Sequence, residues 1–237
     1  MKFLVLQHHP EEHPGIFRDF LTADGITWDS VELDAGEAIP DLGGYDALWA
    51  MGGPMDVWQE DAHPWLKTEK AVIRKAVTEK NLPFLGVCLG HQLLAEALGG
   101  AVGPMDQGEI GVLEIELEAA GREDPLFAGG PSTLKSLQWH SAEVKRLPPG
   151  AVSLAASPVS ANQAIRVGPR AYGIQFHMEV GPDTVPTWAE IPEYWTALEK
   201  SLGADALPAF QAAVSANMDA FNESARRLYK GFMGLFA

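Results

Sequence analysis

Four short apolar runs divide the first 90 residues of the chain, at residues 2–7, 28–33, 47–51 and 83–87. Several are nearly continuous rather than alternating, which is typical of parallel strands buried on both faces. The stretches between them are long enough for helices, and residues 66–79 show a helical apolar spacing. This alternation predicts a doubly wound α/β fold with a mostly parallel central sheet flanked by helices. Its site is expected beyond the carboxyl ends of the strands.

The pattern changes after Ile110. Leu113, Ile115 and Leu117 alternate with acidic residues, as in exposed antiparallel strands. Further strand candidates lie at residues 152–156, 164–167 and 171–176, separated by turns rich in Gly and Pro. We expect these strands to belong to the same domain, some of them forming a small antiparallel side sheet.

The C-terminal segment is predicted to be helical. Its apolar residues recur at helical spacing: Phe210, Val214, Met218, Phe221, Ala225, Leu228 and Phe232. We expect this face to pack on its own domain; a docking face for a partner or a second copy is the alternative. Because no linker is evident, we interpret residues 1–237 as one domain with a helical extension at about 192–237.

Composition narrows the classes of function. The net charge of −15 disfavours nucleic-acid binding, which needs clustered Lys and Arg. A single cysteine cannot form an internal disulfide. The apolar start is too short for a signal peptide, and no apolar run is long enough to span a membrane. We therefore expect a cytoplasmic protein that binds neither membranes nor nucleic acids.

The only cysteine, Cys88, ends the fourth apolar run and precedes a helix-like stretch at residues 93–98. Gly86 and Gly90 bracket it in a Gly-x-Cys-x-Gly pattern typical of a nucleophile elbow with sulfur in place of the hydroxyl. Glycines permit the sharp turn that lifts the side chain out of the sheet. The positive end of the following helix favours the nucleophilic thiolate. A buried inert cysteine is the alternative.

A general base is predicted at the end of the last strand candidate. His177 and Glu179 are two residues apart, so both side chains of an extended segment face one side. The carboxylate of Glu179 can then orient the imidazole of His177, which exchanges a proton with Cys88 and the leaving amine. After the third apolar run, Gly52 and Gly53 allow backbone N–H groups to approach a ligand closely. The N–H groups of Gly53 and Leu89 are the expected oxyanion donors.

These motifs together resemble the class I (triad) glutamine amidotransferase family. The resemblance rests on Gly-Gly-Pro at 52–54, Gly-Val-Cys-Leu-Gly-His-Gln at 86–92 and Phe-His-Met-Glu at 176–179. Further motifs at 52–56, 64–66, 109–111 and 138–140 look like stand-alone members similar to the glutamine amidotransferase domain of GMP synthase. The resemblance implies a flavodoxin-like sheet and hydrolysis of a γ-glutamyl amide through a thioester, with no cofactor.

The resemblance also implies a substrate site. Gln92 is expected to help hold the substrate, together with Gly52 and backbone groups of a loop around His140 and Ser141. Synthetase members commonly carry Ser-His-Gly-Asp where this chain has Trp-His-Ser-Ala at 139–142. This difference leaves two substrates open: free glutamine, with ammonia passed to a separate synthetase, or a γ-glutamyl compound hydrolysed without a partner. Rivals from other classes are a non-catalytic regulatory module and a redox or stress protein of the related cysteine-elbow superfamily.

Three other groups of residues have a structural interpretation. His8, His9 and His13 are expected to form a polar loop rather than a metal site; a wall of the substrate pocket is the alternative. His91 is expected to support the elbow, and Trp65 to pack in the core. The acidic residues Asp56, Glu60 and Asp61 are expected on the solvated surface.

Overall fold

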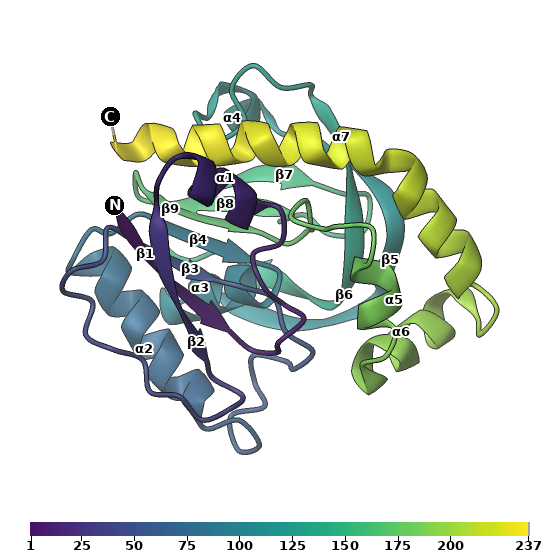
Figure 1. The fold of residues 1–237 in the computed structure, drawn as a ribbon, viewed down its shortest axis with the longest axis horizontal. Helices are drawn as coiled ribbons and strands as arrows, with labels where there is room; N and C mark the ends of the chain where they lie inside the picture. The colour runs from purple at the N-terminus through teal and green to yellow at the C-terminus, as the bar shows by residue number, and fades with distance from the viewer. Residues whose placement is uncertain (237) are drawn as a thin grey trace.

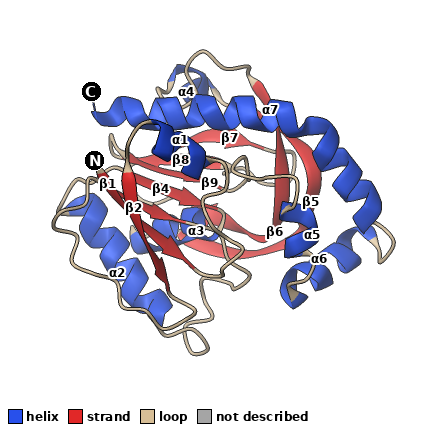
Figure 2. Cartoon of the chain, viewed as in Figure 1, coloured by secondary structure: helices blue, strands red, loops and turns tan. Residues whose placement is uncertain are grey.

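The computed structural model describes residues 1–236, whose nine strands form one sheet in the order β2-β1-β3-β4-β9-β8-β7-β5-β6 (Figures 1 and 2). The strands are β1 (Lys2–Gln7), β2 (Thr27–Glu32), β3 (Ala47–Ala50), β4 (Phe84–Val87), β5 (Ala101–Leu117), β6 (Thr133–Arg146), β7 (Ala151–Ala156), β8 (Ala164–Val167) and β9 (Ala171–Ile174). The first five in this order are parallel, and the others are antiparallel.

Four helices cover the two faces of the parallel part: α1 (Phe17–Ala23) and α7 (Leu207–Met233) lie on one face, and α2 (Trp65–Thr78) and α3 (Leu89–Ala97) on the other. The helices α4 (Ala119–Glu123) and α6 (Pro192–Leu202) pack on antiparallel strands, and α5 (Thr184–Trp188) packs on α7. Along β1, Phe3 and Val5 pack in the core beneath α1 and α7, whereas Leu4 and Leu6 pack in the core beneath α2 and α3. Successive strand residues thus enter different cores, which explains why these strands are apolar throughout. The predicted doubly wound fold is confirmed.

The direction of the parallel strands determines where the predicted site residues come together. β1, β3, β4 and β9 are neighbours that run in the same direction, so their carboxyl ends meet at one edge of the sheet. The segments that leave these ends carry His8, Gly53, Cys88 and His177. Four segments that are far apart in sequence therefore meet at this edge.

The antiparallel strands differ from the sequence prediction in two ways. They are continuous with the parallel strands, because β8 pairs with β9. Residues 139–141 were expected in a loop but lie within β6, which pairs with β5 along most of its length. The reason is that Gln138 and His140 are polar yet buried, which hides the apolar pattern of the strand. The Nε2 of Gln138 donates to the side-chain oxygen of Gln163 at 3.0 Å, which compensates the burial of the amide nitrogen.

The C-terminal segment is helical and packs on the rest of the chain, as predicted. The first half of α7 covers the antiparallel region, where Phe210 lies against Trp139 with ring centroids 5.1 Å apart. Its last turns cover the parallel region, where Phe232 contacts Phe3 and Trp49 (Figure 1). No helix among residues 1–236 combines the length and the apolar character needed to cross a bilayer.

Candidate active site

Cys88 occupies a strained turn between β4 and α3. Its φ of 50° and ψ of −102° are unusual for a residue with a side chain. Its N–H donates to the carbonyl of Ile174 at 2.8 Å, which ties the turn to β9. A Cβ on Gly86 would overlap the carbonyl of Gly90, and a Cβ on Gly90 would overlap that of Ala50. Only glycine fits at positions 86 and 90, so the predicted sharp turn is confirmed.

His177 and Glu179 form a buried pair. The Nδ1 of His177 lies 2.6 Å from Oε1 of Glu179, and Oε2 accepts the N–H of Met178 at 2.9 Å. This pair was predicted directly at the end of the last strand, but β9 already ends at Ile174. His177 instead pairs with Leu137 of β6, through N–H···O bonds of 2.9 and 3.2 Å. The extended conformation that aligns the two side chains therefore depends on β6.

The electrostatics of His177 suit proton transfer. Burial lowers its pKa, but the carboxylate of Glu179 and the sulfur of Cys88 outweigh this effect, and the pKa lies well above its usual value. Because Nδ1 faces the carboxylate of Glu179, which only accepts hydrogen bonds, Nδ1 carries a proton. This hydrogen bond fixes the tautomer of the imidazole. Nε2 is buried without a hydrogen-bond partner among residues 1–236. The ring of Trp188 contacts the imidazole edge-to-face, with centroids 4.7 Å apart.

Two glutamines lie on another side of the cysteine. The Nε2 of Gln175 donates to Sγ of Cys88 at 3.4 Å. The Nε2 of Gln92 donates to Oε1 of Gln175 at 3.1 Å and to the carbonyl of Ala142 at 3.4 Å. Gln92 therefore already has protein partners, and its amide fixes the orientation of the Gln175 amide toward the sulfur. Gln175 directly precedes the Phe-His-Met-Glu motif at 176–179, but no sequence pattern identified it as a site residue.

The two residues that carry the predicted oxyanion donors are neighbours in space. A Cβ built on Gly53 would lie 2.8 Å from Cδ2 of Leu89. Leu89 is the first residue of α3, where backbone N–H groups have no partner within the helix. Among residues 1–236, neither the N–H of Gly53 nor that of Leu89 donates to a protein acceptor. Both groups are thus available to a ligand.

A pocket of about 420 Å³ opens above Cys88. Six predicted site residues line it: Gly53, Cys88, Leu89, Gln92, His140 and Ser141. Gly52, His177 and Glu179 are buried beside it. Asp56, expected on the solvated surface, also lines the pocket, and burial raises its pKa. The helix α6 supplies a further wall that includes Tyr194, which no sequence pattern connected with the site.

The loop after β3 is anchored by one lysine. Nζ of Lys70, on α2, donates to the carbonyl of Val57 at 2.7 Å and to Glu60 at 2.8 Å. It also binds Glu96 of α3 at 2.6 Å. Since residues 53–56 and Gln59 line the pocket, Lys70 holds one pocket wall against two helices.

Glu12 and Tyr194 form a buried pair near the cysteine that sequence reasoning missed. The hydroxyl of Tyr194 donates to Oε1 of Glu12. Burial raises the pKa of Glu12 to about 7, against the opposing charge of His177 and the bond from Tyr194. A Cβ on Gly52 would overlap the Glu12 carboxylate, which therefore lies against that glycine. A contact across 182 positions leaves no local signal in the sequence.

His140 and His91 have different environments. Nε2 of His140 lies 3.2 Å from Oε2 of the buried Glu109, and its Nδ1 lies 2.9 Å from the carbonyl of Ala142. His91 is fully buried behind the elbow, and burial lowers its pKa to about 3, so its ring is neutral. The structural role predicted for His91 agrees with this position.

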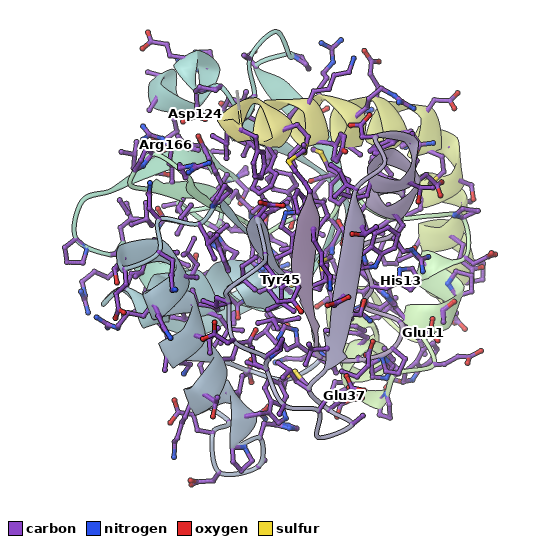
Figure 3. All side chains as sticks on the ribbon, turned by 60° about the vertical axis from the view of Figure 1, so that its left-hand side comes forward. Glu11, His13, Glu37, Tyr45, Asp124 and Arg166 are labelled. Atoms are coloured by element: carbon purple, nitrogen blue, oxygen red, sulfur yellow. The ribbon has the colours of Figure 1, made fainter. Side chains whose placement is uncertain are left out.

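The histidine-rich segment after β1 is a loop, as predicted, but it is not uniformly exposed. His8 is fully buried. Its ring stacks on Trp65, which packs as expected. His13 lies near Glu11 beside the C-terminal helices (Figure 3), and both line a second pocket with Trp188. Among residues 1–236, no cluster of three His, Cys, Asp or Glu residues has an arrangement that could hold a metal ion.

Comparison with known proteins gives consistent matches. Residues 25–187 match the family model described as glutamine amidotransferase class-I. The chain is 33% identical to the glutamine amidotransferase-like protein YfeJ of Salmonella typhimurium over 189 residues, covering 78% of each chain. It is 40% identical to a glutamine-hydrolysing GMP synthase subunit of Thermococcus kodakarensis over 119 residues, covering 48% of this chain and 62% of that protein.

Solved structures match along nearly the whole chain. A glutamine amidotransferase from Thermotoga maritima superposes with a TM-score of 0.85 at 29% identity, covering 98% of this chain and 97% of that chain. A glutamine amidotransferase from Methylobacillus flagellatus superposes with a TM-score of 0.84 at 31% identity, covering 98% and 94%. The similarity therefore includes the C-terminal helices, which lie outside the matched family region.

Proposed function

The chain belongs to the class I glutamine amidotransferase family, and we propose that it is a cysteine-dependent hydrolase of γ-glutamyl amides. Cys88 is the nucleophile, His177 the general base and acid, and Glu179 the group that orients His177. The N–H groups of Gly53 and Leu89 stabilise the oxyanion. The glutamine hydrolysis or amido transfer of the family supports the reaction class, and the residue roles are inferred from the geometry.

The reaction has two half-reactions. Nε2 of His177 takes the thiol proton of Cys88, and the sulfur forms a C–S bond to the γ-carbonyl carbon, whose oxygen becomes an oxyanion held by the two N–H groups. The tetrahedral intermediate collapses with cleavage of the C–N bond, and Nε2 of His177 gives its proton to the departing ammonia or amine. Water, deprotonated by His177, then attacks the thioester and releases a γ-carboxylate and the Cys88 thiol.

The observation that carries this proposal is the pattern of hydrogen-bond partners around the imidazole of His177. Its Nδ1 lies 2.6 Å from a buried carboxylate, while its Nε2 is buried and unpaired among residues 1–236. A buried nitrogen without a partner costs free energy, so its presence calls for an explanation. Proton exchange with Cys88, whose sulfur contributes to the raised pKa of this histidine, provides one.

Two substrate classes remain within this proposal. Free glutamine is supported by the similarity to the GMP synthase protein of Thermococcus kodakarensis, which is named as one subunit of that enzyme and so favours ammonia delivery to a separate synthetase. A larger γ-glutamyl compound is supported by the pocket of about 420 Å³, whose lining lacks Lys and Arg among residues 1–236. Such a pocket offers no cationic side chain to the α-carboxylate of glutamine.

The test is release of ammonia or amine from glutamine and from a panel of γ-glutamyl compounds. We expect wild-type turnover of at least one compound and none with C88A. A diazo-ketone analogue of glutamine should add covalently to Cys88, detected by mass spectrometry of the labelled peptide. Turnover that survives C88A, or an adduct at another residue, would refute the assignment.

The choice of base has its own test. H177A should lower kcat by about 10²–10⁴, the usual contribution of a positioned acid–base group. H140A changes a histidine that lines the pocket, and it should lower kcat far less than H177A does. The reason is that His140 faces Glu109 and the carbonyl of Ala142. Equal losses in the two variants would mean that His177 is not the base.

A further inference from the structure

His8 and Glu69 form a completely buried pair that the mechanism above does not use. Both side chains have a relative exposure of 0%. His8 directly follows β1, and Glu69 lies in α2. Nε2 of His8 lies 2.9 and 3.0 Å from the two carboxylate oxygens of Glu69. Nδ1 of the same ring lies 2.8 Å from the carbonyl oxygen of Gly52.

The hydrogen-bond partners determine where the proton on Nδ1 lies. A carbonyl oxygen only accepts, so Nδ1 must carry a hydrogen and donate it to Gly52. This holds whether the proton shared with Glu69 resides on the imidazole or on the carboxylate. Burial lowers the pKa of His8, but the charge and hydrogen bond of Glu69 and the carbonyl of Gly52 raise it, with a net upward shift. The ring is therefore a fixed donor to Gly52.

The hydrogen bond from His8 to the carbonyl of Gly52 also fixes the direction of the next N–H group, that of Gly53. The peptide bond between Gly52 and Gly53 is trans, as are all peptide bonds in residues 1–236. In a planar trans peptide the C=O and N–H groups point in opposite directions. Since His8 holds the C=O of Gly52, the N–H of Gly53 points away from His8, and Gly53 lines the pocket together with Cys88.

A contribution to folding stability does not by itself account for the buried His8–Glu69 pair. Removing two charges from water costs several kcal/mol, and replacing a buried ion pair by apolar residues is often neutral or stabilising. Here the pair also has a restricted geometry. The ring of Trp65 lies against the imidazole with an interplanar angle of 19° and a centroid distance of 5.4 Å, so it limits rotation of His8.

We propose that His8, held by Glu69 and Trp65, is a positioning residue that aims the N–H of Gly53 at the oxyanion formed above Cys88. The inference rests on the proposed function only in taking Gly53 as an oxyanion donor. Oxyanion donors act through preorganised geometry, and loss of one costs about 10²–10³ in kcat. A tether on the opposite end of the same peptide is a direct way to preorganise it.

Two reactions of Cys88 test the proposal. Acylation by p-nitrophenyl acetate forms a C–S bond, passes through an oxyanion and expels p-nitrophenolate. Alkylation by iodoacetamide forms a C–S bond and expels iodide without any oxyanion. Because Cys88 is the only cysteine, both rates report on one sulfur, with C88A as the blank. A purely structural role would change both rates or neither.

Matched variants separate the two contacts of His8. The amide of Gln in H8Q reaches the position of Nε2 and retains a donor to Glu69 but loses the donor to Gly52. The amide of Asn in H8N reaches the position of Nδ1 and retains the donor to Gly52. H8F/E69M removes both charges while keeping an aromatic ring on Trp65, and it replaces H8Q if thermal melting shows that H8Q does not fold.

We expect H8Q and H8F/E69M to lower the acylation rate about 10-fold or more with alkylation within about twofold of wild type. H8N should keep acylation within about threefold. Equal changes in the two rates, or no change in either, would overturn the positioning role. Since neither probe is a γ-glutamyl compound, the result does not depend on the substrate. Wild type that acylates with p-nitrophenyl acetate but hydrolyses no γ-glutamyl amide would refute the proposed function alone.

Discussion

Replacing Glu12 by Gln should change the pH dependence of stability. Glu12 is 1% exposed, and burial raises the pKa of its carboxyl group from 4.5 to about 7. Below pH 4.5 the group is protonated in both the folded and the unfolded chain. Between pH 4.5 and 7 only the unfolded chain ionises, so ionisation stabilises the unfolded state and the free energy of unfolding falls as the pH rises.

The size of the effect follows from the two pKa values. Linkage gives a loss of about 2–3 kcal/mol in the free energy of unfolding between pH 5 and pH 8. E12Q keeps an oxygen that can accept the hydrogen bond from Tyr194 but cannot ionise, so it should not suffer this loss. Relative to wild type, E12Q should gain about 2–3 kcal/mol over this interval, or about 5–10 °C in Tm for a chain of this size.

The assay is urea unfolding of wild type and E12Q at pH 5 and pH 8, with thermal melting as a second measurement. The quantity to compare is the difference in the free energy of unfolding between E12Q and wild type, because all other groups titrate equally in the two proteins. E114Q, which changes an exposed carboxylate on β5, is the control and should vary with pH by less than about 0.5 kcal/mol. An E12Q difference that is the same at both pH values would refute the reasoning.

Two further predictions concern the elbow and the pocket wall. G90A should cost about 1–3 kcal/mol of stability, because its Cβ would overlap the carbonyl of Ala50. G234A, where a Cβ meets nothing within 4 Å, should cost less than about 0.5 kcal/mol in the same melting experiment; equal costs would contradict the close approach. K70M should raise KM several-fold with kcat little changed, because it releases a wall that binds the substrate. K67M removes a lysine that is 60% exposed and should change neither, so a matching effect there would exclude a specific role for Lys70.

The residues that act locally could be recognised from the sequence. The glycines around Cys88 are recognisable from their local Gly-x-Cys-x-Gly pattern. Gly86 approaches Gly90 within the turn, whereas Gly90 approaches Ala50 of the neighbouring strand β3. His177 and Glu179 are two positions apart, so an extended backbone is enough to align them. The parallel strands are recognisable for a similar reason, since burial on both faces requires apolar residues throughout each run.

Other parts of the site depend on contacts between distant segments. The strand β6 is hidden because Gln138 and His140 are buried polar residues whose partners come from other strands. Tyr194 reaches Glu12 only because α6 packs against the antiparallel strands. Neither feature has a local pattern by which sequence reasoning could detect it.

The amino-acid sequence by itself determined the elbow at Cys88, the strand–helix alternation and the spacing of the His177 pair, because each depends on neighbours a few positions away. The tertiary structure decided what surrounds them. It made His8 a buried donor to Gly52, gave Glu12 a raised pKa and turned α6 into a pocket wall. Burial and charge pairing are properties of the assembled layers, so a residue's neighbours in space, not in sequence, set its chemistry.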